Sequence, residues 1–263
     1  MSTRPEAELR APARAAAWRE SRALFDLGHM LVPLLLPAGE AQARRKRNIL
    51  VLPGFGADDR ATWPLRRYLK KLGHHAEGWG LGLNRAGVEI KHTLADLSPG
   101  WAIEPVARYR GEGSVPMLCD RMVARARERH AALGGPLTLI GWSLGGVVAR
   151  EVARELPELV EEVITLGTPV LGGPKYTAAA AFFRKRGMDL DWIEREVAKR
   201  QAQPIRVPIT AIASPSDGVV GFAATRDRHS PNVRHVDVDA SHLGLCFNPV
   251  VWRQIVDTLN RRA

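Results

Sequence analysis

The feature that most constrains this chain is a series of short, continuous apolar runs, each followed by a segment with helical periodicity. The run at residues 48–52 ends at Pro53-Gly54, as expected of a strand buried on both faces. Similar runs lie at residues 137–140, 163–166, 207–213 and 233–238, with a weaker candidate at 75–79. Helices are expected at residues 62–72, 116–133, 144–156 and 249–261. Strands that alternate with amphipathic helices form right-handed βαβ units, so the sequence predicts an α/β fold with a mostly parallel sheet and helices on both faces.

The chain divides into an arm and a globular domain at about residue 48. Residues 1–47 are rich in Ala, Arg and Pro, with a helix expected over 13–27, and they end in Arg44-Arg45-Lys46-Arg47. Residues 48–263 hold all the expected strands, and a 263-residue chain with 45% hydrophobic residues can bury one substantial core. We therefore expect a single α/β domain at 48–263, preceded by an N-terminal helical arm at 1–47.

Two long connections interrupt the alternation of strands and helices. One spans residues 80–114, and the other spans about 170–204 with helical stretches at 176–186 and 191–200. In an open parallel sheet, connections that follow strands lie at the carboxyl edge, where ligands bind. Long connections in compact domains also tend to be functional rather than plain surface excursions. We expect a small helical lid at about residues 170–204 and a second pocket-forming segment at 80–114.

The chain is strongly basic, with a formal net charge of +10 and an isoelectric point near 10.3. Such a charge favours anionic partners such as nucleic acid or acidic lipid. The excess is arginine spread along helices beside acidic residues, as at Arg125, Arg127 and Glu128, and there is no nucleic-acid-binding motif. A solvated, arginine-rich surface is the simpler interpretation, so we expect no nucleic-acid partner and keep peripheral contact with an anionic membrane as an alternative.

The remaining composition excludes several classes of protein. Cys119 and Cys246 are too few for a disulfide framework, and no Cys/His cluster has zinc-site spacing, so we expect buried free thiols and no metal. The most apolar run, residues 31–37, is shorter than the roughly 20 residues of a membrane-spanning helix and holds two prolines. An export signal would need an unusually long leading region that contains acidic residues. The expected location is the cytoplasm, with peripheral membrane contact as the alternative.

The segment Gly141-Trp142-Ser143-Leu144-Gly145 places a serine between an expected strand and an expected helix. In that context Gly-x-Ser-x-Gly forms a sharp turn that lifts the serine hydroxyl above the edge of the sheet. Glycines remove side chains where such a strained turn packs closely. The motif therefore predicts that Ser143 is a nucleophile.

A serine hydroxyl needs a base to accept its proton, usually a histidine oriented by a carboxylate. His242 follows the last expected strand, and Asp217 follows the strand at 207–213, so both belong at the same sheet edge as Ser143. The chain order Ser143, Asp217, His242 is the order expected for this arrangement. Asp217 also suits a plain Asx turn, and Asp237 and Asp239 are reserve candidates for the acid.

Acyl transfer also requires donors aimed at the oxyanion of the tetrahedral intermediate. The residue after the nucleophile, Leu144, supplies one backbone N–H. The second donor is expected from Pro53-Gly54-Phe55-Gly56, whose glycines permit close backbone approach, and we assign it to the Phe55 N–H. This loop lacks the spacing of phosphate-binding glycine motifs, so no nucleotide cofactor is expected.

Over most of residues 48–262 the chain resembles the α/β-hydrolase superfamily, in particular the small bacterial serine lipases and esterases. The resemblance lies in the loop at Leu52–Gly56, the elbow at 141–146, the segment 165–169 that leads into a lipase lid, and the acid turn at 216–220. Pro53 stands where this family usually has histidine, and the family's leading antiparallel strands are not evident. Residues 1–47 match nothing in the family.

This resemblance implies hydrolysis of a carboxylic ester through an acyl-enzyme on Ser143, with no cofactor. An apolar lid that contains residues 178–181, Phe182, Phe183 and Trp192, near Trp142, would suit a lipid-like substrate, although helix packing explains these residues equally well. A thioesterase, amidase or acyltransferase would use the same three residues. A non-catalytic, membrane-surface binding protein on a hydrolase scaffold is the alternative from a different class.

Overall fold

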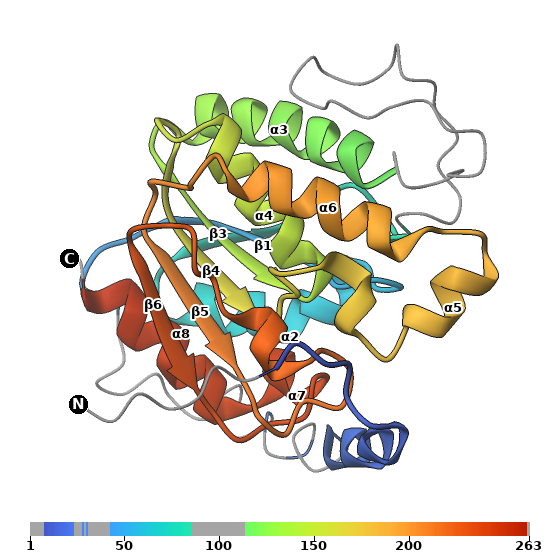
Figure 1. Cartoon of the computed structure of the whole chain (residues 1–263). Helices are drawn as coiled ribbons and strands as arrows, with labels where there is room; N and C mark the ends of the chain where they lie inside the picture. The colour runs from blue at the N-terminus through green and yellow to red at the C-terminus, as the bar shows by residue number, and fades with distance from the viewer. Residues whose placement is uncertain (1–7, 24–27, 29, 31–42, 86–113, 262–263) are drawn as a thin grey trace, which may run out of the picture.

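The computed structural model describes residues 8–23, 28, 30, 43–85 and 114–261. Its centre is a six-stranded sheet in the order β2-β1-β3-β4-β5-β6, in which every neighbouring pair is parallel (Figure 1). The strands are β1 (Asn48–Leu52), β2 (His75–Gly78), β3 (Leu137–Trp142), β4 (Val160–Leu166), β5 (Ile209–Ala213) and β6 (Val233–Asp237). All six apolar runs therefore form strands, and the α/β fold expected from the sequence is confirmed.

Helices cover both faces of this sheet because successive residues of the strands point to opposite sides. Leu50, Leu139 and Val163 pack against α3 (Ser114–Leu133) and α4 (Leu144–Glu155). Ile49 and Ile140 pack against α2 (Asp59–Lys71) and α8 (Pro249–Arg261) on the other face. Because both faces are buried, the strands read as continuous apolar runs rather than as alternating ones.

The start of α2 is set by its N-cap residue, Asp58. The Asp58 carboxylate accepts a hydrogen bond of 2.8 Å from the Arg60 N–H, so the helix begins at Asp59, three residues before the position expected from periodicity. A helix N-cap depends on one polar side chain, so the apolar periodicity alone does not predict where the helix begins.

The segment predicted to form a lid contains a short 3₁₀ turn, η4 (Gly173–Tyr176), followed by α5 (Ala180–Lys185) and α6 (Leu190–Gln201). We call residues 170–204 the cap. It has a small core of its own, which contains Ala180, Phe183, Met188 and Leu190. Most of the other expected pocket segment, 80–114, lies outside the described residues.

The N-terminal arm, residues 8–23, lies against the loops at the carboxyl edge of the sheet (Figure 1). Its helix is the 3₁₀ helix η1 (Arg14–Arg22), whereas the sequence predicts a helix over 13–27 without this tighter geometry. Tertiary contacts described below override helix propensity here. Residues 24–27, the end of the predicted helix, lie outside the described residues.

The strand order places a crevice at one edge of the sheet. The chain runs from β1 outward to β2 and then returns through α3 to β3 on the other side of β1. At such a switch point the loops after the two central strands diverge and leave room for a ligand. Here these loops begin at Pro53 and Ser143, so the candidate oxyanion loop and the candidate nucleophile meet at that edge.

Among the described residues, no helix has both the length and the apolar character needed to cross a bilayer. Cys119 and Cys246 are both buried free thiols, as the sequence predicts. Burial raises the pKa of Cys246 to about 12, so this thiol stays protonated.

Candidate active site

Ser143 lies at the turn between β3 and α4 in a strained backbone conformation. Its φ is 53° and its ψ is −122°. It is the only non-glycine residue with a positive φ among those that the structure describes. The Ser143 N–H donates a hydrogen bond of 2.8 Å to the carbonyl oxygen of Leu166. A polar residue held in such a conformation at a sheet edge is typical of a nucleophile elbow.

The glycines around Ser143 are required by the packing of this turn. A Cβ atom at Gly141 would lie 2.3 Å from the Cα of Gly146, and one at Gly145 would lie 2.4 Å from the carbonyl oxygen of Leu52. At Gly146 a Cβ would meet the Thr168 hydroxyl at 1.9 Å. The Thr168 hydroxyl in turn donates to the Ser143 carbonyl oxygen at 3.1 Å. The elbow is therefore wedged between the loops that follow β1 and β4.

Asp217 and His242 are joined by a short hydrogen bond. His242 Nδ1 lies 2.7 Å from Asp217 Oδ2, and both side chains are buried. The other carboxylate oxygen, Oδ1, accepts hydrogen bonds of 2.7 Å from the N–H groups of Val219 and Val220. One carboxylate oxygen of Asp217 thus faces the imidazole, while the other is held by the backbone of its own turn.

Several groups that the sequence analysis did not single out hold this pair in place. Trp142 Nε1 donates to the His242 carbonyl oxygen at 3.1 Å. The Ser214 hydroxyl oxygen accepts from the Ser216 and Ala240 N–H groups at 3.0 and 3.1 Å, which ties the acid turn to the histidine loop. The contacts of Trp142 with His242 and of Ser214 with Ala240 join residues distant in sequence, so no local motif predicts them.

Gly167 forms the wall behind the Asp217–His242 pair. Its φ is +55°, and a Cβ atom here would lie 3.0 Å from Asp217 Oδ2 and 3.1 Å from His242 Nδ1. A side chain at this position would push the carboxylate and the imidazole apart. The contact between Asp217 and His242 therefore requires the glycine in the segment 165–169.

The loop after β1 lies directly against the elbow. A Cβ atom at Gly54 would meet the Cβ of Ser143 at 3.2 Å, so the backbone of this loop passes within contact distance of the serine. Phe55, Leu144 and Ser143 line one cavity. Leu144 is the first residue of α4, and the N–H groups of a helix's first turn have no acceptor within the helix. Both predicted oxyanion donors thus belong to the wall of the cavity that holds Ser143.

Asn84 fixes the shape of that loop and was missed by the sequence analysis. Its Nδ2 donates to the Pro53 carbonyl oxygen at 2.9 Å. Its backbone N–H donates to Ala57, and its carbonyl oxygen accepts from Gly56 at 2.7 Å. The side chain is fully buried. Asn84 lies in the 80–114 connection predicted to form the pocket, but no spacing motif distinguishes it there.

The cavity has a volume of about 540 Å³ and holds both Ser143 and His242 on its wall. The cap supplies an apolar part of the lining with Phe183, Met188 and Trp192. Phe182 is instead 42% exposed and lies edge-on to Phe55, with ring centroids 6.4 Å apart. Of the apolar residues predicted for the lid, some therefore face the cavity and others pack at its rim.

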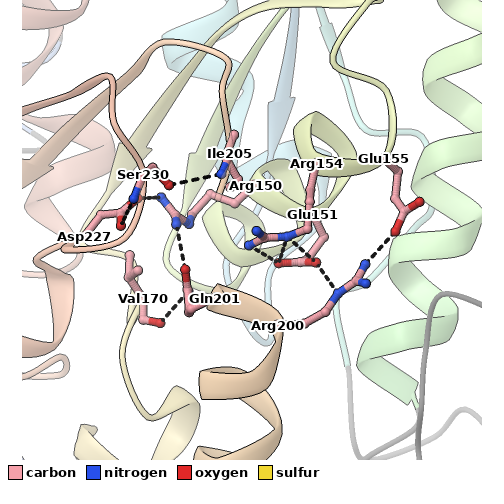
Figure 2. Close-up of polar contacts among 10 residues, drawn as sticks. All are labelled: Arg150, Glu151, Arg154, Glu155, Val170, Arg200, Gln201, Ile205, Asp227 and Ser230. Atoms are coloured by element: carbon pink, nitrogen blue, oxygen red, sulfur yellow. Dashed lines mark hydrogen bonds and ion pairs between the residues drawn. The ribbon is translucent and has the colours of Figure 1, made fainter. Parts of the chain in front are cut away.

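At the other end of the cap, a charged network joins α6 to α4. Figure 2 shows Arg150 between Asp227 and Gln201, and Glu151 between Arg154 and Arg200. Arg150 lies 2.8 Å from Asp227, and both side chains are almost wholly buried. Arg200 of α6 pairs with Glu151 of α4 at 2.9 Å. The interpretation of the arginines as a solvated surface is therefore wrong for Arg150, which is neutralised within the protein instead of facing solvent.

The structure gathers the predicted residues of the site at one edge and separates the reserve candidates from it. Asp237 pairs with Arg226, and Asp239 pairs with Arg22 of the arm. Within the described part of the chain, no group of three or more His, Cys, Asp or Glu residues is arranged to hold a metal ion. The site thus brings a strained serine, on the wall of a cavity, together with a histidine that lies within hydrogen-bond distance of a buried aspartate.

Comparison with known proteins agrees with this architecture. No protein-family model matches the sequence. A pimeloyl-[acyl-carrier protein] methyl ester esterase of Sodalis glossinidius is 31% identical over 160 residues, which are 59% of this chain and 52% of that protein. The match thus spans about half the length of this relative.

Solved structures of lipases share the fold at low sequence identity. Bacillus licheniformis lipase BlEst2 superposes with a TM-score of 0.56 at 16% identity, over 84% of this chain and 95% of that one. The monoacylglycerol lipase of Paleococcus ferrophilus gives 0.55 at 14% identity, over 83% and 97%. The chain has the α/β-hydrolase fold, and the resemblance noted in the sequence is confirmed at that level.

Proposed function

We propose that this protein is a serine hydrolase that cleaves carboxylic esters, with Ser143 as nucleophile, His242 as general base and Asp217 as the carboxylate that orients the base. The observation that carries the proposal is the 2.7 Å hydrogen bond between His242 and Asp217 on the wall of the cavity that holds the strained Ser143. The esterase relative and the lipase folds support the same class of reaction.

In the first half of the reaction, His242 Nε2 takes the proton from the Ser143 hydroxyl as Oγ attacks the ester carbonyl carbon. The carbonyl oxygen becomes an oxyanion, which the N–H groups of Phe55 and Leu144 stabilise. Asp217 stabilises the imidazolium that forms. The intermediate then collapses, the bond to the alcohol oxygen breaks, and the leaving group takes the proton from His242.

In the second half, His242 accepts a proton from water as that water attacks the acyl-enzyme carbonyl carbon. Collapse of this second tetrahedral intermediate breaks the acyl bond to Ser143 Oγ, which recovers its proton from His242. The carboxylic acid leaves. No bound cofactor takes part in either half.

The apolar lining from the cap favours a substrate with an acyl chain or another lipid-like group. Phe183, Met188 and Trp192 would contact such a chain, since apolar cavities bind ligands by removing apolar surface from water. The relative from Sodalis glossinidius is named as an esterase of a methyl ester on an acyl group bound to a carrier protein. Methyl esters of acyl groups therefore belong among the substrates to test.

The test is labelling with a fluorophosphonate, followed by a panel of p-nitrophenyl esters of increasing chain length. Wild-type protein should be labelled and Ser143→Ala should not, with loss of essentially all turnover. Matched thioester and amide substrates separate a thioesterase or amidase from an esterase. If Ser143→Ala keeps full activity, the assignment is wrong. Absence of both labelling and hydrolysis would favour a binding protein on a hydrolase scaffold, tested by salt-sensitive binding to anionic vesicles.

A further inference from the structure

Glu20, in the 3₁₀ helix of the arm, directs its carboxylate at the backbone of the two loops that carry the proposed acid and base. Oε1 accepts hydrogen bonds from the Gly218 N–H at 2.9 Å and the His242 N–H at 3.0 Å. Oε2 accepts from the Leu243 N–H at 3.0 Å. One carboxylate thus satisfies three backbone donors from two separate loops.

The three donors are not arbitrary positions in those loops. Gly218 directly follows Asp217, and the other two N–H groups belong to His242 and its neighbour. The carboxylate therefore links the backbone beside the acid to the backbone of the base. Hydrogen bonds to a charged acceptor are shorter and stronger than neutral ones, so this link restrains the distance between the loops.

The shape of the acid turn is matched to the arm. A Cβ atom at Gly218 would lie 2.5 Å from the Ala16 carbonyl oxygen and 2.9 Å from Glu20 Oε1. A Cβ atom at Gly221 would lie 2.1 Å from the Arg10 carbonyl oxygen. Two glycines of the turn thus allow the arm backbone to approach at distances that any side chain would prevent.

We propose that Glu20 is a positioning residue for the proposed reaction: it holds His242 and Asp217 in register by binding the backbone of both their loops. The inference rests on the proposed function of that pair. Trp142 holds the His242 carbonyl oxygen from the elbow, and Glu20 holds the His242 N–H from the arm. The histidine backbone is therefore anchored on both sides, one anchor coming from a segment outside the α/β domain.

The test compares Glu20→Ala, Glu20→Gln and Glu20→Asp with wild type in the full chain. Loss of hydrogen bonds to a charged group should lower kcat about 10- to 100-fold for Glu20→Ala, with KM within about twofold because none of the arm residues that the structure describes lines the cavity. Glu20→Gln keeps one acceptor oxygen and should retain more activity than Glu20→Ala. Glu20→Asp keeps the charge on a shorter stem and should be the least impaired of the three.

Arg22→Ala is the matched control. Arg22 lies two residues from Glu20 and pairs with Asp239 at 3.2 Å on the surface, so its loss weakens attachment of the arm without touching His242 or Gly218. Its kcat should stay within about twofold of wild type, because exposed ion pairs contribute little. If Arg22→Ala lowers kcat as much as Glu20→Ala does, the effect belongs to the arm as a whole, and the proposal is wrong.

Amide hydrogen exchange provides a readout that does not depend on activity. Glu20→Ala should accelerate exchange at the Gly218, His242 and Leu243 amides and leave the amides of β3 unchanged. Unchanged exchange at these three amides, or an unchanged kcat in an active protein, would overturn the role of Glu20. If wild-type protein shows no fluorophosphonate labelling, the proposed function fails instead, and accelerated exchange would still support the contacts as a structural link.

Discussion

Two segments cover the carboxyl edge of the sheet, and they are attached by different chemistry. The arm meets the acid turn and the histidine loop through one carboxylate and close backbone contact. The cap is held to α4 by the ion pair of Arg200 with Glu151 and by the hydrogen bond from Arg150 to Gln201, and to the loop after β1 by aromatic rings. The arm touches the loops that carry the proposed acid and base, whereas the cap touches the space where a substrate would lie. Changes in the arm should therefore alter kcat, and changes in the cap should alter stability or KM.

Loss of the buried partner of Arg150, the α4 residue that the cap contacts through Gln201, should show the largest effect. Asp227→Asn keeps the oxygen that accepts from the His229 and Ser230 N–H groups but leaves Arg150 buried without a counter-charge. We expect the free energy of unfolding to fall by about 3–5 kcal/mol, measured by urea denaturation. The matched control is Glu155→Gln at the more exposed end of the network, which should cost under about 1 kcal/mol. Equal losses in the two variants would contradict the distinction.

Displacement of the arm should give the second-largest effect. In Gly218→Ala the new methyl group overlaps the Ala16 carbonyl oxygen, so the arm must shift away from the acid turn. Because small misplacements of catalytic groups are costly, we expect kcat to fall roughly 10²-fold. Limited trypsin digestion should cut the arm faster after Arg19 and Arg22. Gly28→Ala is the control, since a Cβ there meets nothing within 4 Å. An arm that stays equally resistant in Gly218→Ala would show that it is not seated on this turn.

Acid should weaken the ion pair of Arg150 with Asp227 in a defined pH range. Burial alone would raise the pKa of Asp227, but the Arg150 charge and the backbone N–H groups of His229 and Ser230 lower it to about 2, from an ordinary value of 3.8. Since the pKa is depressed in the folded state, the stabilisation is complete above about pH 4 and is lost as pH falls toward 2. This contribution is about 2 kcal/mol. The difference in unfolding free energy between wild type and Asp227→Asn should therefore narrow by about 2 kcal/mol on acidification, and a constant difference from pH 5 to pH 2 would contradict the pairing.

The aromatic contact of the cap should give the smallest effect. Phe182 packs edge-on against Phe55 and Phe183 while 42% of it stays exposed. Phe182→Ala removes contacts of the kind that contribute about 0.5–1.5 kcal/mol, so we expect KM for a long-chain ester to rise roughly 2- to 10-fold with kcat little changed. Trp63→Ala, an exposed aromatic on α2, should leave both constants unchanged. A fall in kcat without a change in KM would place Phe182 in the chemical step.

The fold could be predicted because its signals are local. Runs such as residues 49–52 are apolar on both faces of the sheet. The turn around Ser143 requires three nearby glycines, which are visible in the sequence. Asp217 and His242 could be placed at the same edge because parallel strands end on one side, and the structure joins them by a hydrogen bond. Their catalytic roles stay a prediction until tested.

The rest depends on contacts between residues far apart in the chain. Glu20 is an unremarkable acidic residue in an arginine-rich arm, and its partners are backbone amides, which have no sequence signature. Asn84 likewise acts on the backbone of Pro53 and Gly56. Arg150 reads as one more surface arginine until Asp227, 77 positions later, is seen beside it. Side chains that serve a distant backbone can be found only once the fold brings them together.

The contact between Glu20 and His242 has a consequence for how the chain is made. The two residues are 222 positions apart, so the arm is synthesised well before the loop whose backbone donors its carboxylate binds. Contacts of such long range are formed late in folding. The arm is thus expected to dock after the histidine loop has folded, and protection of the Gly218 and His242 amides in a newly made chain would report that docking.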